Sequence, residues 1–260
     1  MKYFYLSLLF VFSTNSFAQF YAEGGYELAF LNQKETNRII SEFNDREGHN
    51  LADFKTLSGY RFGFGKYGRF TNMEISFGNI FKKQLSKNPS ILRENAEVIV
   101  NCFSFDAAVA YRPLKSEFFS IGGALHFGQV RYRYSFGGDY RVPIAQYGIW
   151  AEIFADLAFK FRFLLKKESR DEQFYIFKIR PFYRLHSSYD LQKFQQDFND
   201  DNTVIPGERM QSLNNFGLRI SLVVPFLNQI EKDFYKKGGK LDQEKLKKKM
   251  ERMEKQAPQF

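Results

Sequence analysis

Two side chains near the end of a predicted strand are of types that can carry out hydrolysis. His186 and Ser188 stand two residues apart in the stretch LHSSYD, and Asp190 and Glu208 are acids in the same region. A histidine can activate a serine hydroxyl as a nucleophile when a carboxylate orients the imidazole. Histidine and serine are also ordinary residues where a strand meets a loop. The pair therefore stands as an alternative, and we assign no catalytic residue.

Acidic side chains gather around the segment FNDDN. Asp197, Asp200 and Asp201 offer the carboxylate oxygens that calcium prefers, but the segment lacks the glycine and the terminal glutamate of a calcium-binding loop. The chain contains no zinc-ligand spacing, no phosphate-binding loop and no nucleic-acid motif. We therefore interpret the segment as a solvated acidic loop and expect no metal, no cofactor and no nucleic-acid partner.

Charged side chains alternate with apolar ones over long stretches of the chain. In residues 147–163 every second residue is apolar, and the residues between them include Glu152, Asp156 and Lys160. A period of two residues predicts a β-strand with one apolar face and one charged face. The same kind of pattern recurs and predicts eight strands, at residues 20–31, 57–66, 70–81, 96–111, 118–134, 147–163, 174–186 and 215–226. Pro181 lacks an N–H, so we expect a bulge in the seventh strand.

The polar faces of these strands carry charges of both signs. The acids are Glu23, Glu27, Glu74, Asp106, Glu152 and Asp156. The bases are Arg61, Lys160, Arg162, Lys178, Arg180, Arg184 and Arg219. Eight strands close into a barrel just wide enough to be filled by its own side chains, and buried charges need partners. We therefore predict a lumen closed by charge pairs, with a narrow pore lined by the same residues as the alternative.

The composition agrees with an all-β, eight-stranded antiparallel transmembrane β-barrel followed by a short C-terminal helical tail. The mean hydropathy of −0.43 excludes a bundle of transmembrane helices, yet 18% of the residues are aromatic. Aromatic girdles mark the two lipid interfaces of membrane barrels. The single cysteine, Cys102, permits no internal disulfide and falls in a predicted strand. The net charge of +9 suits an anionic lipid surface as partner.

The connections between the predicted strands alternate from long to short along the whole chain. If the chain starts and ends in the periplasm, every long connection lies outside the cell and every short one inside, as in outer-membrane barrels. A soluble lipocalin-like binder has the opposite facing, with apolar side chains inside and polar ones outside. The alternation of side chains by itself does not distinguish the two facings, so the lipocalin-like binder stays as an alternative.

The two ends of the chain differ from the barrel in composition. Residues 1–18 combine Lys2, a short apolar run and a terminal Ser-Phe-Ala, which predicts a secretory signal cleaved after Ala18. Residues 19–226 form the predicted barrel. Residues 227–260 are rich in lysine and predict a weakly amphipathic helix in a periplasmic tail.

The last predicted strand, NFGLRISLVVPF, carries Asn215, Gly217, Ile220 and Leu222 in the order of the insertion signal on the last strand of outer-membrane barrels. With the signal peptide, the alternating strands and the long outer connections, it resembles the OmpA/OmpX-type small barrels and, more loosely, the PorT-like barrels. The resemblance covers residues 20–226. It implies the outer membrane of a Gram-negative-type bacterium, with both termini periplasmic and with membrane lipid and the barrel assembly machinery as partners. A structural or interaction role in the cell envelope is the expectation.

The His186–Ser188 pair is also similar to the His-x-Ser pair of PagL-type lipid A deacylases, which are eight-stranded barrels. That resemblance implies a lipid A-modifying enzyme as the alternative function. The asparagine that follows the serine in that motif is Tyr189 here, and the pair falls on the lumen-facing set of side chains.

The tail provides a test of what the barrel contacts. We expect residues 227–260 to dock on an acidic periplasmic protein, anionic phospholipid or the carboxylates of peptidoglycan. Deleting residues 238–260 should leave the barrel folded and reduce its co-purification with envelope partners. The contacts should weaken as salt rises, because exposed charges are screened beyond ~8 Å at physiological ionic strength. A truncated protein that keeps every partner at low salt would show that the tail is only a solvated appendage.

Overall fold

The computed structural model describes residues 19–68, 70–87, 95–113, 118–137, 139–140, 143–163, 173–199 and 210–226. The predicted signal at residues 1–18 and the predicted helical tail at 227–260 lie outside these residues.

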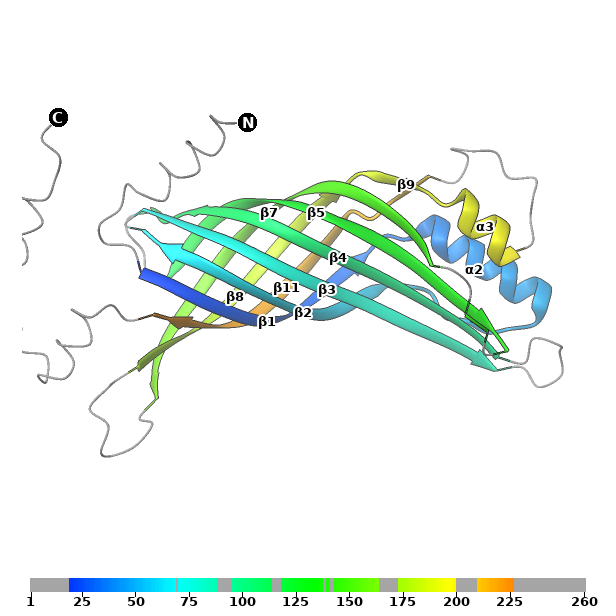
Figure 1. Cartoon of the computed structure of the whole chain (residues 1–260), viewed down its shortest axis with the longest axis horizontal. Helices are drawn as coiled ribbons and strands as arrows, with labels where there is room; N and C mark the ends of the chain where they lie inside the picture. The colour runs from blue at the N-terminus through cyan, green and yellow to red at the C-terminus, as the bar shows by residue number, and fades with distance from the viewer. Residues whose placement is uncertain are drawn as a thin grey trace, which may run out of the picture.

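Eight long strands form a closed antiparallel barrel (Figure 1). Each strand pairs with its neighbour along the chain, and β1 pairs with β11 to close the ring. The barrel strands are β1 (Gln19–Leu31), β2 (Thr56–Tyr67), β3 (Thr71–Lys87), β4 (Asn95–Tyr111), β5 (Phe119–Phe136), β7 (Ile144–Phe163), β8 (Gln173–His186) and β11 (Asn215–Pro225). The predicted fold class is therefore confirmed, and each predicted strand has its counterpart in the structure.

The two ends of the barrel differ. At one end, here called the terminal end, β1 begins and β11 finishes; the opposite end carries the helices and is called the helical end (Figure 1). The β1–β2 connection contains α2 (Lys34–Glu47), and the β8–β11 connection contains β9 (Ser188–Asp190), α3 (Gln192–Asn199) and β10 (Met210–Ser212). A short strand, β6 (Asp139–Tyr140), pairs with the end of β5. Neither α2 nor α3, the helices of the described part, is long and apolar enough to cross a membrane.

The faces of the strands settle which side is apolar. Along β11 the side chains alternate strictly, with Phe216, Leu218, Ile220 and Leu222 outward and Arg219 fully buried inward. The other barrel strands follow the same rule, so the exterior exposes large apolar side chains and the interior holds the charges. A lipocalin-like binder would have the reverse arrangement, so that alternative is wrong for this chain.

Two sequence expectations about the strands need correction. β3 continues to Lys87, beyond the predicted end at residue 81, and pairs with β4 over this extension. The extension carries lysines on both faces, so its pattern resembles that of a loop. At Pro181 the ladder between β7 and β8 is interrupted, but Phe154↔Phe182 and Leu157↔Ile179 keep one register on either side. The missing N–H therefore produces a gap in the ladder and no bulge.

Helix α2 forms a face that packs inward, because Thr36, Ile39, Ile40 and Phe43 recur at helical spacing and are all buried. Its start has no cap from its own residues. Instead, the Gln211 side chain of β10 accepts a hydrogen bond from the backbone N–H of Glu35 at 2.9 Å. The helix ends at Gly48, whose φ of 66° is the left-handed conformation that glycine adopts most easily.

Gly217 faces inward at a point where strands approach closely. A Cβ at this position would lie 2.4 Å from the Leu28 carbonyl oxygen and 2.3 Å from the ring of Phe182. Gly217→Ala should lower the free energy of unfolding by about 1–3 kcal/mol, the usual cost of overpacking. Gly123→Ala is the matched control, since its Cβ would come no closer than 3.4 Å to a neighbouring atom. Denaturant titration in lipid vesicles, followed by Trp150 fluorescence, measures both; equal effects would contradict the packing argument.

Candidate functional site

The inward-facing charges form one network across the lumen, to which all eight barrel strands contribute. Its members come from every strand: Glu23 and Glu27 of β1, Arg61 of β2, Glu74 of β3, Asp106 of β4, His126 of β5, Glu152 and Asp156 of β7, Lys178, Arg180 and Arg184 of β8, and Arg219 of β11. All of these side chains are buried. The arrangement exists only when the barrel is closed, because the partners lie on strands that are far apart in the sequence.

Glu27 is the centre of the half of the network nearer the helices. Its carboxylate receives Arg61 Nε at 2.9 Å, Arg184 Nη1 at 2.9 Å and Arg219 Nη2 at 3.1 Å. If the Glu27 carboxylate were the only acid here, the three guanidinium groups around it would repel one another. Glu152 offsets this repulsion, because its oxygens lie 3.0 Å from Arg184 Nε and 3.4 Å from Arg219 Nη2.

Asp106 and His126 complete this half of the network. Asp106 forms an ion pair with Arg61 and accepts a hydrogen bond from the Ser76 hydroxyl at 2.8 Å. His126 Nε2 lies 3.2 Å from Glu152 Oε2, and its Nδ1 lies 3.7 Å from Asp106 Oδ1. The His126 ring therefore lies between two carboxylates, without a hydrogen bond from either ring nitrogen to another described residue.

Glu74 is the centre of the half nearer the terminal end. The pairing of β8 with β11 places Arg180 directly opposite Arg219, and like charges in that position destabilise a sheet. Glu74 reaches across from β3 and lies 2.9 Å from Arg180 Nη2 and 3.8 Å from Arg219 Nη1. Lys178 Nζ also lies 2.9 Å from Glu74 and pairs with Glu23. Arg219 thus connects the two halves of the network.

Eleven of the predicted lumen charges lie in this network. Lys160 is exposed, contrary to the prediction that it lines the lumen. The pairing of β7 with β5 ends at Leu157, so beyond that point β7 has only β8 beside it and its inward face meets solvent. The side chain of Arg162 lies outside the described part of the structure.

Sequence reasoning missed His126 and the aromatic stack beside it. The Trp150 ring stacks between His186, at 4.6 Å between ring centroids, and His126, at 5.9 Å. Trp150 and His126 are directly opposite one another in the ladder between β5 and β7. The signal was present in the sequence, since both residues fall on the charged face of their strands by the period of two.

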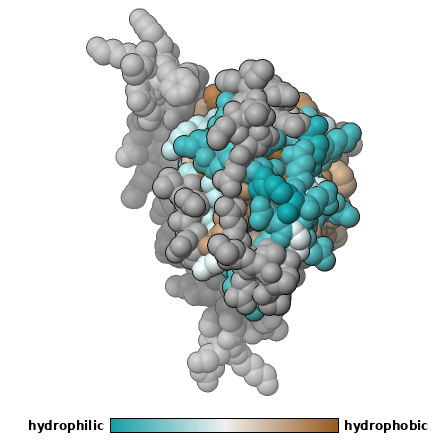
Figure 2. All heavy atoms as spheres, turned by 90° about the vertical axis from the view of Figure 1, so that its right-hand side faces the viewer, coloured by the Kyte–Doolittle hydropathy of each residue, from teal (hydrophilic) through white to brown (hydrophobic). Residues whose placement is uncertain are grey.

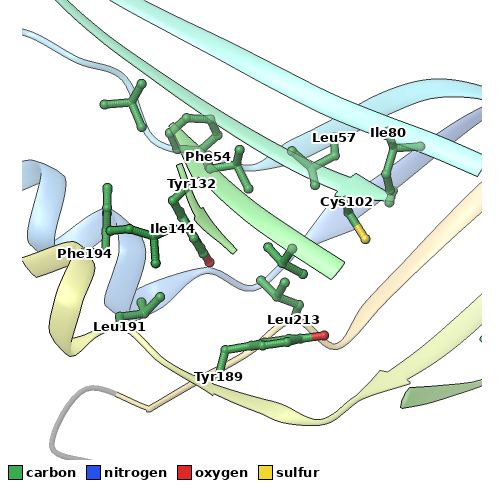
Figure 3. Packing of buried hydrophobic residues seen from close by; sticks show 14 of the residues in the cluster. Phe54, Leu57, Ile80, Cys102, Tyr132, Ile144, Tyr189, Leu191, Phe194 and Leu213 are labelled. Carbon is green, nitrogen blue, oxygen red and sulfur yellow. The ribbon is translucent and has the colours of Figure 1, made fainter. Parts of the chain in front are cut away.

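An apolar plug fills the lumen at the helical end. We use this name for α2, α3 and the apolar wall residues that pack against them. Phe194 and Phe198 of α3, Phe43 of α2, and Tyr132 and Tyr134 of β5 are buried in one cluster, with Phe43 and Phe198 at 4.3 Å between ring centroids. Figure 3 shows Tyr132 and Ile144 on the side of Phe194 and Leu191, and Leu57 beside Ile80 and Cys102 in the same cluster. The prediction of a lumen filled by charge pairs thus describes only part of the interior.

Polar contacts fasten the two helices of the plug to each other and fix the segment that follows α2. The Asn199 side-chain amide donates to the Ile39 carbonyl at 3.2 Å, and Arg46 donates to the Asn199 carbonyl, so α3 is fastened to α2. Asn44 exchanges two hydrogen bonds of 2.9 Å with the backbone of Leu51. The segment NRIISEF in the connection between β1 and β2 is therefore part of a packed helix.

The structure does not bring the hydrolytic pair together. His186 stacks on Trp150, and its Nε2 lies 3.1 Å from the Asn215 amide nitrogen. Ser188 is exposed on β9, opposite Ser212. Asp190 accepts a hydrogen bond from the backbone N–H of Gln192 at 2.9 Å, at the start of α3. Burial raises the pKa of the Tyr189 hydroxyl, which stays neutral and supplies no base.

The expected acidic loop is only partly within the described residues. Asp197 is exposed on α3, while Asp200, Asp201 and Glu208 lie outside the described part. Within the described ranges, no group of three or more His, Cys, Asp or Glu side chains is placed to hold a metal ion. Cys102 is buried on β4, where it belongs to the apolar cluster.

The residues of the proposed insertion signal divide between the two faces of β11. Asn215 and Gly217 face inward, whereas Ile220 and Leu222 are exposed on the outside, 41% and 43% respectively. Recognition of these residues by the assembly machinery stays a prediction.

Solved structures similar to this chain include three bacterial proteins. Ail of Yersinia pestis, in complex with the heparin analogue sucrose octasulfate, is 9% identical, with 80% of this chain and 99% of that chain covered and a TM-score of 0.45. Neisserial surface protein A is 9% identical, with 80% of this chain and 99% of that chain covered and a TM-score of 0.37. The outer membrane protein OprG from Pseudomonas aeruginosa is 11% identical, with 81% of this chain and 97% of that chain covered and a TM-score of 0.37.

No family model matches the chain, and no curated protein matches it. The fold assignment accordingly rests on the strand pairing and the facing of the side chains described above.

Glu27→Gln tests the network at its centre. The change removes one charge beside three arginines, and breaking a buried ion pair typically costs about 3–5 kcal/mol of folding free energy. Glu47→Gln is the matched control, because Glu47 pairs with Arg46 at 3.0 Å on the exposed side of α2, where such pairs contribute less than about 1 kcal/mol. Denaturant titration in lipid vesicles measures both variants. A loss no larger for Glu27→Gln than for Glu47→Gln would contradict the role of the network.

Proposed function

We propose that this protein is an integral outer-membrane barrel with a closed lumen and a structural or interaction role in the cell envelope, exposing its helical end outside the cell. The observation that carries the proposal is the combination of an apolar outer wall with an interior sealed by charges. Among described outward positions, Phe64, Ile153 and Phe216 are each more than half exposed. Such a wall is stable only against hydrocarbon, since exposed apolar area of this extent in water promotes association.

The filled interior argues against a pore. The charge network occupies the middle and the terminal end of the lumen, and the plug occupies the helical end. Arg184, Arg219 and Glu27 are each at most 1% exposed. An ion moving through the barrel would therefore have to pass two successive barriers of different chemistry.

The orientation follows from the connections and from the surface at the helical end. The two long connections, which carry α2 and α3, both belong to the helical end, and the shortest connection, between β2 and β3, belongs to the terminal end. Outer-membrane barrels have long loops outside the cell and short turns in the periplasm. Figure 2 looks onto the helical end, where the described surface is mainly hydrophilic with hydrophobic atoms toward its margin. We infer that the helical end faces water outside the cell, which places both chain termini in the periplasm.

The interaction role rests on the rigidity of the plug. Buried residues of α2 and α3 anchor the helices in the barrel, so their exposed faces, including Lys34, Arg38, Asp45 and Lys193, are held in fixed positions. A surface fixed in this way pays little ordering entropy when a partner binds. The tail at residues 227–260 is the second proposed contact, with a periplasmic protein or peptidoglycan.

Conductance measurements test the closed lumen. In a planar lipid bilayer the wild-type protein should show no sustained conductance. The variant Phe194→Ser/Phe198→Ser loosens the plug, yet it should also conduct no current, because the charge network still blocks the barrel. A shift in gel mobility between boiled and unboiled samples confirms that each protein inserted into the bilayer is a folded barrel. Sustained single-channel steps from the folded wild type would support the narrow-pore alternative instead.

A further inference from the structure

The outward-facing side chains of β3, β4 and β5 form rows that can be followed from strand to strand. One row is purely aromatic and joins Phe77, Phe105 and Phe127. Two rows nearer the helical end contain positive charge. They join Phe81, Asn101 and Arg131, and then Lys83, Ile99 and Arg133.

The height of these rows places them at the boundary of the hydrocarbon. On β4, the outward residues run from Tyr111 at the terminal end to Asn101 in the first charged row. The strand from Asn101 to Tyr111 extends ~33 Å along its own axis and ~25 Å along the membrane normal at a tilt of ~40°, which matches the apolar band of a membrane barrel. Arg131 and Arg133 therefore lie where lipid headgroups begin.

Arg131 and Arg133 differ from the other arginines whose side chains the structure describes. The lumen arginines are buried in ion pairs, and Arg38, Arg46 and Arg112 have carboxylate, carbonyl or amide partners. Arg131 and Arg133 are exposed, and within the described part of the chain no ion pair or hydrogen bond engages their side chains. Two consecutive outward positions of one strand, ~7 Å apart, thus carry guanidinium groups available to an external ligand.

The neighbouring side chains match an amphiphilic ligand. Below the two arginines, toward the terminal end, Phe127 is 50% exposed and Tyr147 on β7 is 80% exposed, and Phe81, in the row of Arg131, is 43% exposed. At the side, Lys83 in the row of Arg133 is paired with Glu97 at 2.6 Å. A ligand here would meet apolar surface with one part and fixed positive charge with another.

We propose that Arg131 and Arg133 form a site for the phosphate groups of a glycolipid in the outer leaflet. The planar guanidinium fork binds phosphate oxygens in pairs, while the aromatic side chains below contact the acyl chains. The long paired strands hold the two arginines at a constant height, so the site is preformed. The inference rests on the proposed function, because it requires the helical end to face outside.

The test compares two double variants that each remove two positive charges from the full chain. Arg131→Gln/Arg133→Gln alters the site. Lys55→Gln/Lys160→Gln is the matched control, since both lysines are exposed and neither belongs to the charged rows. Each protein is reconstituted in phosphatidylcholine nanodiscs and titrated with bisphosphorylated lipid A. The site variant should bind about 10-fold more weakly, as expected for lost charge-assisted contacts, and the control should bind like the wild type.

Three outcomes would overturn the site. The first is equal binding by the wild type and the arginine variant. The second is equal binding of lipid A and its dephosphorylated form. The third is displacement of lipid A by an equal concentration of phosphatidylglycerol, which would show a preference for anionic lipid in general. Gel mobility of boiled and unboiled samples reports separately whether the barrel is folded, and protease accessibility of the helical end on intact cells reports orientation. Failure of the proposed function is thereby distinguished from failure of the site.

Discussion

Every backbone N–H and C=O group of a strand in hydrocarbon must find a partner within the protein, because lipid offers none. An open sheet would leave two unpaired edges, so the sheet has to close, and the pairing of β1 with β11 closes it. Closure at eight strands gives a narrow interior that side chains must fill. The apolar exterior, the charged interior and the plug at one end all follow from this single requirement.

The interior is filled by two kinds of packing with different physical demands. Charges removed from water are costly unless each one meets opposite charges and hydrogen-bond partners. The network satisfies this by crossing the lumen, so that Glu27 on β1 meets arginines on β2, β8 and β11. The plug needs only apolar contact, and two short helices provide it with Phe43, Phe194 and Phe198. Trp150, stacked between two histidines, lies between the polar and the apolar regions.

The same residue type serves opposite purposes on the two faces of the wall. Arg61 and Arg184 are inside, where their charge is neutralised by carboxylates and their role is to join strands. Arg131 and Arg133 are outside and exposed at the boundary of the apolar band. A charge at that height costs little, because the unfavourable free energy of a basic side chain facing lipid falls toward the interface. An arginine on the inner face of the wall therefore stabilises the barrel, whereas an arginine on the outer face at the edge of the apolar band is available to a ligand.

The amino-acid sequence by itself determined the eight strands, the face of each strand that carries charge, and the all-β class. It could do so because the period of two is a local property that needs no knowledge of the partner strand. Strand limits were least certain where both faces become polar, as in the extension of β3 to Lys87. The face that holds His126 was also readable, since His126 alternates with Leu125 and Phe127.

Only the tertiary structure decided which charges meet, because partners such as Arg219 and Glu74 depend on the stagger of the closed barrel. It alone placed Lys160 outside the lumen, since that depends on where the neighbouring strand β5 ends. It also decided that α2 and α3 plug the barrel. Helical spacing predicts an apolar face at Ile39, Ile40 and Phe43, but not the surface that covers it. Only the tertiary structure showed that the apolar face of each strand points outward. A period of two is the same in a membrane barrel and in a soluble one, so the sequence pattern does not say which face is outside.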